Sequence, residues 1–421
     1  MKNSRKVSMF DYDWISVLLF NLLVLIGIVS IYSATYNETQ NHILQTFYGK
    51  QALWFAFSYV LVVGISLIPL KNIKNNASIL YLIGVVLLIL ILLIGVNING
   101  NKSWFRFGNF SIQPAEFVKL LTVLGLAKLL TEPEFKITNF KNLLQASTLI
   151  LVPVLLILLQ PDLGSAIVFL SLFLVFYRDG VSIFYYLLSI LIIALFITTI
   201  YLGQQEILII GSIFIFILFN ALTYFISKKI FWLQTFFVLS LSILTVLGTN
   251  FIFKKILKPH QRNRIEIVLG KKKDDKGTGY NLKQALIAIG SGGLYGKGLL
   301  KGSQTKGDYI PEQHTDWILT VIGEQWGFLG TLTVVLLYTF LLIRLIFLAE
   351  RQKQKFSRIV GYGLVFILFA HYALNMLMVL GLFPTIGIPL PFLSYGGSSL
   401  WAFTLLLFIF LKFDAHRVED W

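Results

Sequence analysis

The fold is decided by residues 316–347, which read DWILTVIGEQWGFLGTLTVVLLYTFLLIRLIF. This run is almost entirely apolar and exceeds the roughly 20 residues that a helix needs to cross a bilayer. It therefore predicts a membrane-spanning helix. Two acids interrupt it, Asp316 at its first position and Glu324 about two helical turns further along. Because ionisable side chains are costly at membrane depth and usually functional there, both acids require an explanation.

The composition extends this prediction to the whole chain of 421 residues. Hydrophobic residues make up 57% and charged residues only 13%, and the mean hydropathy is +0.79, which excludes a soluble globular protein. Cysteine is absent, which excludes a disulfide framework, a thiolate nucleophile and a cysteine-ligated metal. In a membrane chain, the formal net charge of +15 indicates cytoplasmic loops and anionic lipid rather than nucleic acid.

The chain contains about twelve apolar runs of membrane-spanning character, so we predict an all-α polytopic membrane protein. The runs lie near residues 14–34, 51–70, 77–95, 114–131, 142–159, 164–178, 182–203, 207–226, 231–253, 316–347, 357–383 and 397–413. Basic residues precede the first run and follow alternate runs, all on one side: Lys2, Arg5, Lys6, Lys71, Lys74, Lys136, Lys141, Arg178, Lys228, Lys229, Arg344, Arg351, Lys353, Lys355, Arg358, Lys412 and Arg417. By the positive-inside rule, both termini are expected in the cytoplasm.

This topology leaves the polar segments 96–113, 254–315 and 384–396 on the opposite side. Arg262 and Arg264 lie in the large loop 254–315. They suit phosphate oxygens, because a guanidinium group can donate two parallel hydrogen bonds. A solvated basic loop beside lipid headgroups is the competing interpretation.

The glycine-rich part of this large loop spans residues 288–304 and includes Lys297. It lacks the spacing of a nucleotide-binding loop. The dense glycines still indicate tight turns and close backbone approach, so we expect a re-entrant or surface-lying loop.

Five polar or aromatic residues also have structural alternatives. Glu116 and Lys119 share a helical face at i and i+3, and either form an internal ion pair or contact a ligand. Asp162 can cap the helix that follows it. The dipole of the following helix stabilises the negative charge of Asp316 whether or not this acid is catalytic. Trp104 is either an interfacial anchor or a surface on which a sugar ring stacks.

Six motifs, in this order along the chain, resemble those of the SEDS family of shape, elongation, division and sporulation proteins. They are QPAEF (113–117), QPDLG (160–164), QRNR (261–264), AIGSGGLYGKG (288–298), PEQHTD (311–316) and GIPLPFLSYGGSS (387–399). The likeness covers almost the whole chain. Two stretches, NGNKSWFRFGNFSIQPAEF and IPEQHTDWILTVIGEQWG, are more similar to the elongation-type RodA proteins than to the division-type FtsW proteins.

The resemblance implies a peptidoglycan glycosyltransferase that polymerises lipid II, an undecaprenyl-pyrophosphoryl disaccharide-pentapeptide, at the outer face of the bacterial cytoplasmic membrane during elongation and shape maintenance. Such a transfer inverts the anomeric carbon, so a single carboxylate can serve as general base. The departing pyrophosphate needs positive charge or a divalent cation such as Mg or Mn. The resemblance also implies a class B penicillin-binding protein as transpeptidase partner, within the elongation machinery.

The same resemblance suggests roles for individual residues. Asp316 matches the essential acid of the family and is expected to be the base or a ligand of a divalent cation. The residues expected at the substrate cavity are Trp104, Glu116, Lys119, Asp162, Arg262 and Arg264, with Lys297 nearby. Glu324 is expected to keep the cavity polar or to pair with a basic residue, and Ser398 to support the structure or contact substrate.

Two departures from the family pattern and two competing functions stay open. Most members have ten spans, whereas this chain has about twelve apolar runs, so a single domain over 1–421 would carry an inserted helix pair at 182–226. In addition, Gln325 stands where the family usually has a second acid. A lipid II flippase is the alternative function, because polar groups at membrane depth also suit a transporter. However, the polar groups crowd to one side, and no inverted repeat is evident. A noncatalytic scaffold would leave Asp316 unexplained.

Overall fold

The structure is a computed structural model that describes residues 11–36, 43–98, 101–108, 110–227, 232–257, 259–272, 277–307 and 309–418. Its internal contacts divide the chain into two compact units, Met1–Asp179 with Lys276–Trp421, and Gly180–Asp275. Some basic residues used to predict sidedness lie outside the described residues: Lys2, Arg5, Lys6, Lys228 and Lys229.

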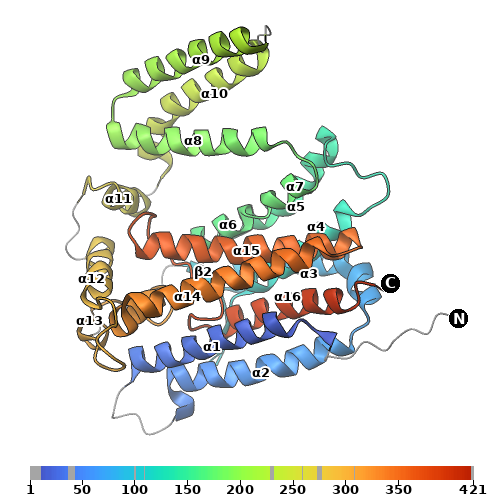
Figure 1. Cartoon of the computed structure of the whole chain (residues 1–421), viewed down its shortest axis with the longest axis vertical. Helices are drawn as coiled ribbons and strands as arrows, with labels where there is room; N and C mark the ends of the chain where they lie inside the picture. The colour runs from blue at the N-terminus through green and yellow to red at the C-terminus, as the bar shows by residue number, and fades with distance from the viewer. Residues whose placement is uncertain are drawn as a thin grey trace, which may run out of the picture. The chain divides into compact units, whose positions relative to one another are not determined.

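Helices dominate both units (Figure 1). The first unit contains α1 (Trp14–Thr35), η2 (Ile43–Gln45), α2 (Phe47–Leu67), α3 (Leu70–Ile94), β1 (Val96–Ile98), β2 (Asn101–Phe107), β3 (Phe110–Ile112), α4 (Pro114–Leu130), α5 (Phe140–Leu158), α6 (Leu163–Leu170), α7 (Phe173–Arg178), α12 (Thr278–Ser291), α13 (Ser303–Lys306), α14 (Ile318–Glu350), α15 (Lys355–Val379) and α16 (Gly397–Ala415). The second unit contains α8 (Ile183–Leu202), α9 (Gln205–Ser227), α10 (Trp232–Phe251), η3 (Ile252–Ile256) and α11 (Pro259–Val268).

Each predicted apolar run coincides with a helix or with a pair of short helices. Within the described ranges, nine helices are long and apolar enough to cross a membrane. Helix α4, the α6–α7 pair and the apolar part of α9 (Gln205–Ile217) are shorter. The predicted polytopic helical architecture is therefore confirmed. The stretch 182–226 corresponds to α8 and α9, which share the second unit with α10 and α11.

Helix α4 is buried over nearly its whole length. Pro114 opens it, since a proline at the first helical position has a suitable φ and lacks only an N–H that would have no helical partner. The helix packs against α3, α5, α15 and α16. Its first turns therefore place Glu116 and Lys119 inside the bundle, where they are 4% and 1% exposed.

Ion pairs join the helix ends at one end of the first unit. The pairs are Arg344–Asp13, Arg351–Asp414, Arg178–Glu350 (2.6 Å) and Lys355–Asp179 (2.8 Å). The four basic members are among the residues that the sequence assigns to a single side of the membrane. The structure thus brings them together at one end of the bundle.

A small antiparallel sheet of β1, β2 and β3 precedes α4. Val96 of β1 pairs with Trp104 of β2, and Arg106 of β2 pairs with Ser111 of β3. From the sequence, residues 96–113 are expected only as an external polar segment, with Trp104 as an interfacial anchor or a sugar-stacking surface. The alternation of polar and aromatic residues in NKSWFRF is the period-2 pattern of a strand, and it was the signal for the hairpin.

Helix α14 is interrupted at Gly327, whose φ of 68° and ψ of −159° are not helical. The glycine-rich segment 292–298, called the strap below, pairs with the backbone at this break. Glu324 O and Gln325 O accept from Lys297 N (3.0 Å) and Gly298 N (2.9 Å), while Phe328 N and Leu329 N donate to Gly293 O (2.8 Å) and Leu294 O (3.1 Å). The predicted glycine-rich loop is therefore docked against the break in α14.

Replacing Gly327 with alanine is expected to lower the apparent unfolding temperature in detergent. A Cβ at this position would lie 2.3 Å from Gly296 N, and a left-handed non-glycine residue costs about 1–3 kcal/mol. Gly64→Ala is the matched control, because a Cβ at Gly64 meets nothing within 4 Å. Equal unfolding temperatures for the two variants would show that the strap does not need the break at Gly327.

Candidate active site

Asp316 lies in the turn that leads into α14, one residue before the N-cap Trp317. Its backbone carbonyl accepts a hydrogen bond of 2.8 Å from Asn375 Nδ2 of α15. Its carboxylate faces Gly387, where a Cβ would lie 3.1 Å from Asp316 Oδ2. The half-buried acid is therefore oriented by two parts of the chain distant from it in sequence.

Residues 384–396, called the cradle segment below, run beside Asp316. Ser394 Oγ donates to Thr315 O at 2.6 Å, and Tyr395 N donates to His314 O at 2.9 Å. Burial raises the pKa of Tyr395 to about 12, so its hydroxyl stays protonated near neutral pH. The cradle segment therefore fixes the backbone of the turn that carries the acid.

Glu116 and Lys119 form a buried ion pair, with Lys119 Nζ 2.7 Å from Glu116 Oε1. Lys119 Nζ also lies 2.8 Å from His371 Nε2 and 4.8 Å from the centre of the Phe403 ring. Glu116 Oε2 is buried and has no hydrogen-bond partner within the part of the chain that is described. The ion pair expected from the sequence is therefore present, and one of its oxygen atoms is still able to accept a hydrogen bond.

Asp162 caps α6, as its sequence context suggested. Its carboxylate accepts from Ser165 N (3.0 Å) and Ser165 Oγ (2.9 Å), and also from Gln113 Nε2 (2.8 Å). Gln113 N in turn donates to Ser398 Oγ at 3.2 Å, next to the start of α16. Asp162 and Ser398 therefore meet at Gln113, the residue that precedes α4.

The second acid of the opening run, Glu324, is fully buried and holds the connection between the strap and α13. Lys297 Nζ lies 2.8 Å from its Oε1, and both Gln304 N and Thr305 N donate to its carboxylate at 2.9 Å. Gln325 beside it makes neutral hydrogen bonds, to Ser33 Oγ and Thr305 Oγ1. Lys297 is thus engaged with Glu324, which stabilises the fold around the break in α14.

The remaining predicted residues lie elsewhere. Trp104 is half-buried on the central strand β2. Arg262 and Arg264 lie on α11 of the second unit. Two positions along a helix correspond to a rotation of about 200°, so the two side chains leave nearly opposite sides of α11. The prediction that these arginines bind phosphate oxygens of the substrate stays a prediction.

A divalent cation at Asp316 would need further ligands. Among the described residues, no group of three or more His, Asp or Glu side chains is placed to hold an ion. The described residues therefore provide no such cluster, and a divalent cation at Asp316 would have water and substrate oxygens among its other ligands.

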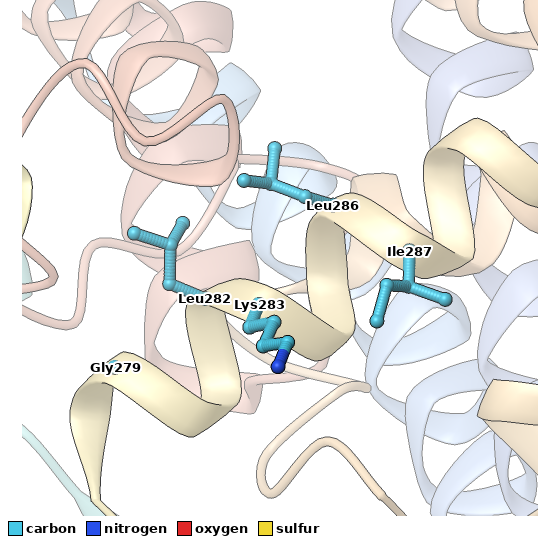
Figure 2. Close-up of a pocket in the computed structure, with 5 residues that line it drawn as sticks. All are labelled: Gly279, Leu282, Lys283, Leu286 and Ile287. Atoms are coloured by element: carbon cyan, nitrogen blue, oxygen red, sulfur yellow. The ribbon is translucent and has the colours of Figure 1, made fainter. Parts of the chain in front are cut away.

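Helix α12 packs beside the strap against α14 (Figure 1). Its inner face buries Leu282, Ala285 and Ala288, while Leu286 and Ile287 are exposed. A pocket of about 380 Å³ is lined by Gly279, Leu282, Lys283, Leu286 and Ile287. Figure 2 shows how these five residues lie along α12. An apolar outer face with a lysine is typical of helices that lie in a membrane interface.

His371 and Asn375 contact the cradle segment beside Asp316, but neither was predicted as a site residue from the sequence. Both are buried in α15, at 2% and 0% exposure. The available signal was the pair of polar residues four apart inside the apolar run 357–383, because such residues share one helical face.

Comparison with known proteins gives consistent matches along the chain. A family model of cell cycle proteins, covering FtsW, RodA and SpoVE, matches residues 13–211 and 204–419. The peptidoglycan glycosyltransferase RodA of Treponema pallidum is 30% identical over 429 residues, which cover 97% of this chain and 98% of the relative. The peptidoglycan glycosyltransferase MrdB of Escherichia coli K12 is 31% identical over 363 residues, which cover 86% of this chain and 84% of the relative.

Solved structures agree with these matches. A chain from a peptidoglycan synthase complex, described as coordinating polymerisation and crosslinking, gives a TM-score of 0.71 at 28% identity and covers 97% of this chain and 99% of its own. The crystal structure of the rod shape determining protein RodA of Thermus thermophilus gives a TM-score of 0.62 at 25% identity, with 97% and 98% covered.

Proposed function

Because this chain belongs to the family of FtsW, RodA and SpoVE cell cycle proteins, we propose that it is an elongation-type peptidoglycan glycosyltransferase that polymerises lipid II. The relatives named RodA and MrdB support this activity over most of the chain. The observation that carries the proposal is the carboxylate of Asp316, which is held against Gly387 while Asn375 and the cradle segment fix its backbone.

In the proposed reaction, Asp316 takes the proton from the 4-hydroxyl of the acceptor sugar. The hydroxyl oxygen then attacks the anomeric carbon of the donor, and the bond from that carbon to the pyrophosphate oxygen breaks with inversion. The electron pair of that bond leaves with undecaprenyl pyrophosphate, so no covalent enzyme intermediate is required. A positioned base of this kind typically contributes about 10²–10⁴-fold to the rate.

The charge of the leaving pyrophosphate must also be neutralised. Arg262 and Arg264 of α11 are the proposed partners, because guanidinium groups bind phosphate oxygens in a bidentate manner. Lys297 is a weaker candidate, since Glu324 already holds its ammonium group. If a cation participates, the pyrophosphate supplies most of its ligands.

The site is proposed to face the outside of the bacterial cytoplasmic membrane. The turn carrying Asp316 precedes α14, whereas Arg344, Arg351 and their acidic partners lie at the far end of that helix. Basic residues favour the cytoplasmic side, so Asp316 is assigned to the opposite side. A class B penicillin-binding protein is the proposed partner, because one similar solved chain comes from a complex that couples polymerisation to crosslinking.

The purified chain tests the proposal when it is incubated with lipid II, with and without its transpeptidase partner, and the products are separated by size. Glycan strands longer than the substrate disaccharide are expected. Movement of labelled lipid II across vesicle bilayers without any polymer would instead support the flippase. If neither polymer nor movement were seen, only the scaffold function would remain.

A further inference from the structure

Two buried polar side chains of α15 face the cradle segment. His371 and Asn375 are four residues apart and therefore lie on one helical face. Asn375 Nδ2 donates to Ile388 O at 2.7 Å as well as to Asp316 O at 2.8 Å. His371 Nδ1 lies 2.9 Å from Pro389 O. Two successive carbonyl groups of the cradle segment are thus held by one face of α15.

The contacts of His371 define its tautomer. A carbonyl oxygen can only accept a hydrogen bond, so Nδ1 carries the proton that is donated to Pro389 O. Nε2 then has a free electron pair, which accepts from Lys119 Nζ at 2.8 Å. The ion pair of α4 therefore fixes the imidazole in the form that donates to the cradle segment.

The cradle segment needs such external support. Pro389 and Pro391 have no N–H to donate, and Phe392 is a non-glycine residue with a φ of 70°, a conformation that persists only where surrounding contacts enforce it. Tyr338 OH donates to Pro391 O at 2.8 Å, and Ser394 Oγ accepts from Leu390 N at 2.8 Å. Side chains therefore supplement the few backbone hydrogen bonds of this segment, such as that from Ser394 N to Leu390 O (2.9 Å).

We infer that His371 is a positioning residue for Asp316. Its Nδ1–H anchors Pro389, which lies two residues after Gly387, and this anchor sets the depth at which Gly387 lies under the Asp316 carboxylate. The inference rests on the proposed function, because it assigns to His371 the alignment of a base whose reaction is itself proposed. If His371 were purely structural, its substitution would change folding stability. The activity of the variants would then not depend on which ring nitrogen contact is kept.

Three variants separate the two nitrogen contacts. His371→Phe keeps the ring that packs edge-to-face on Phe403 at 5.1 Å and removes both nitrogen atoms. His371→Asn places an amide nitrogen near the former Nδ1 and can still donate to Pro389 O. His371→Gln places its amide near the former Nε2 and can still contact Lys119.

The measurement is kcat and KM for lipid II polymerisation, together with the unfolding temperature of each variant. A displaced base lowers the rate strongly, so His371→Phe is expected to lose about 10- to 100-fold in kcat. KM is expected to change little, because the phosphate-binding groups are untouched. His371→Asn is expected to be faster than His371→Gln at matched unfolding temperatures.

A glutamine variant as fast as the asparagine variant, or faster, would overturn the inference, because the contact with Pro389 would then be irrelevant. This comparison decides the question even when His371→Phe fails to fold. The proposed function would be contradicted by a different result, namely that the wild-type chain with its partner makes no polymer.

Discussion

Asp316→Asn is expected to reduce the rate of lipid II polymerisation by about 10²–10⁴-fold, the usual contribution of a positioned general base. Asparagine has nearly the same volume and cannot accept the proton of the acceptor hydroxyl. The hydrogen bond from Asn375 uses the backbone carbonyl of Asp316, so the substitution keeps that contact. Strand synthesis should fall while the unfolding temperature stays near that of the wild type.

Glu312→Gln is the control for this experiment. Glu312 precedes Asp316 in the same turn, but its side chain is 48% exposed, and its carboxylate contacts His314 and Thr315. Its neutralisation is expected to leave the rate within about 2-fold, as for most surface substitutions. Full polymerisation by Asp316→Asn would remove Asp316 from the role of base.

The helices could be predicted because hydropathy depends only on local composition. The same holds for Asp162, whose place before an apolar run predicts the cap that it forms, and for the spacing of Glu116 and Lys119, which predicts their ion pair. In each case the partner lies within one turn of the chain. Contacts within one helical turn can therefore be predicted from the sequence.

The contacts that organise Asp316 are of another kind. The glycines of the strap predict close backbone approach, but not that the approached segment is the break at Gly327. Likewise, Glu324 accepts from Gln304 N and Thr305 N of α13, about twenty positions away. Gly387 belongs to the motif GIPLPFLSYGGSS, but its contact with the Asp316 carboxylate depends on tertiary placement. Asp316 could be singled out by its motif, whereas the long-range contacts around it could not be predicted from the sequence.

Glu116→Ala is expected to destabilise the protein by about 3–5 kcal/mol, the usual effect of removing one partner from a buried ion pair. Lys119 is 1% exposed, so its ammonium group would lose the carboxylate that neutralises it without gaining water. The apparent unfolding temperature and the monodisperse fraction in detergent measure this loss. Lys119→Met is expected to have a similar effect, because it leaves the carboxylate of Glu116 buried and uncompensated.

The double variant Glu116→Gln with Lys119→Met separates the charge from the packing. It removes both charges and keeps similar volumes, so it should recover much of the stability that either single variant loses. Arg178→Ala with Glu350→Ala is the control, because those side chains are 49% and 42% exposed and such pairs contribute at most about 1 kcal/mol. A double variant as unstable as Glu116→Ala would show that Glu116 stabilises the bundle through contacts other than Lys119. Recovery of stability without recovery of polymerisation would place the pair, with its link to His371, in the alignment of Asp316.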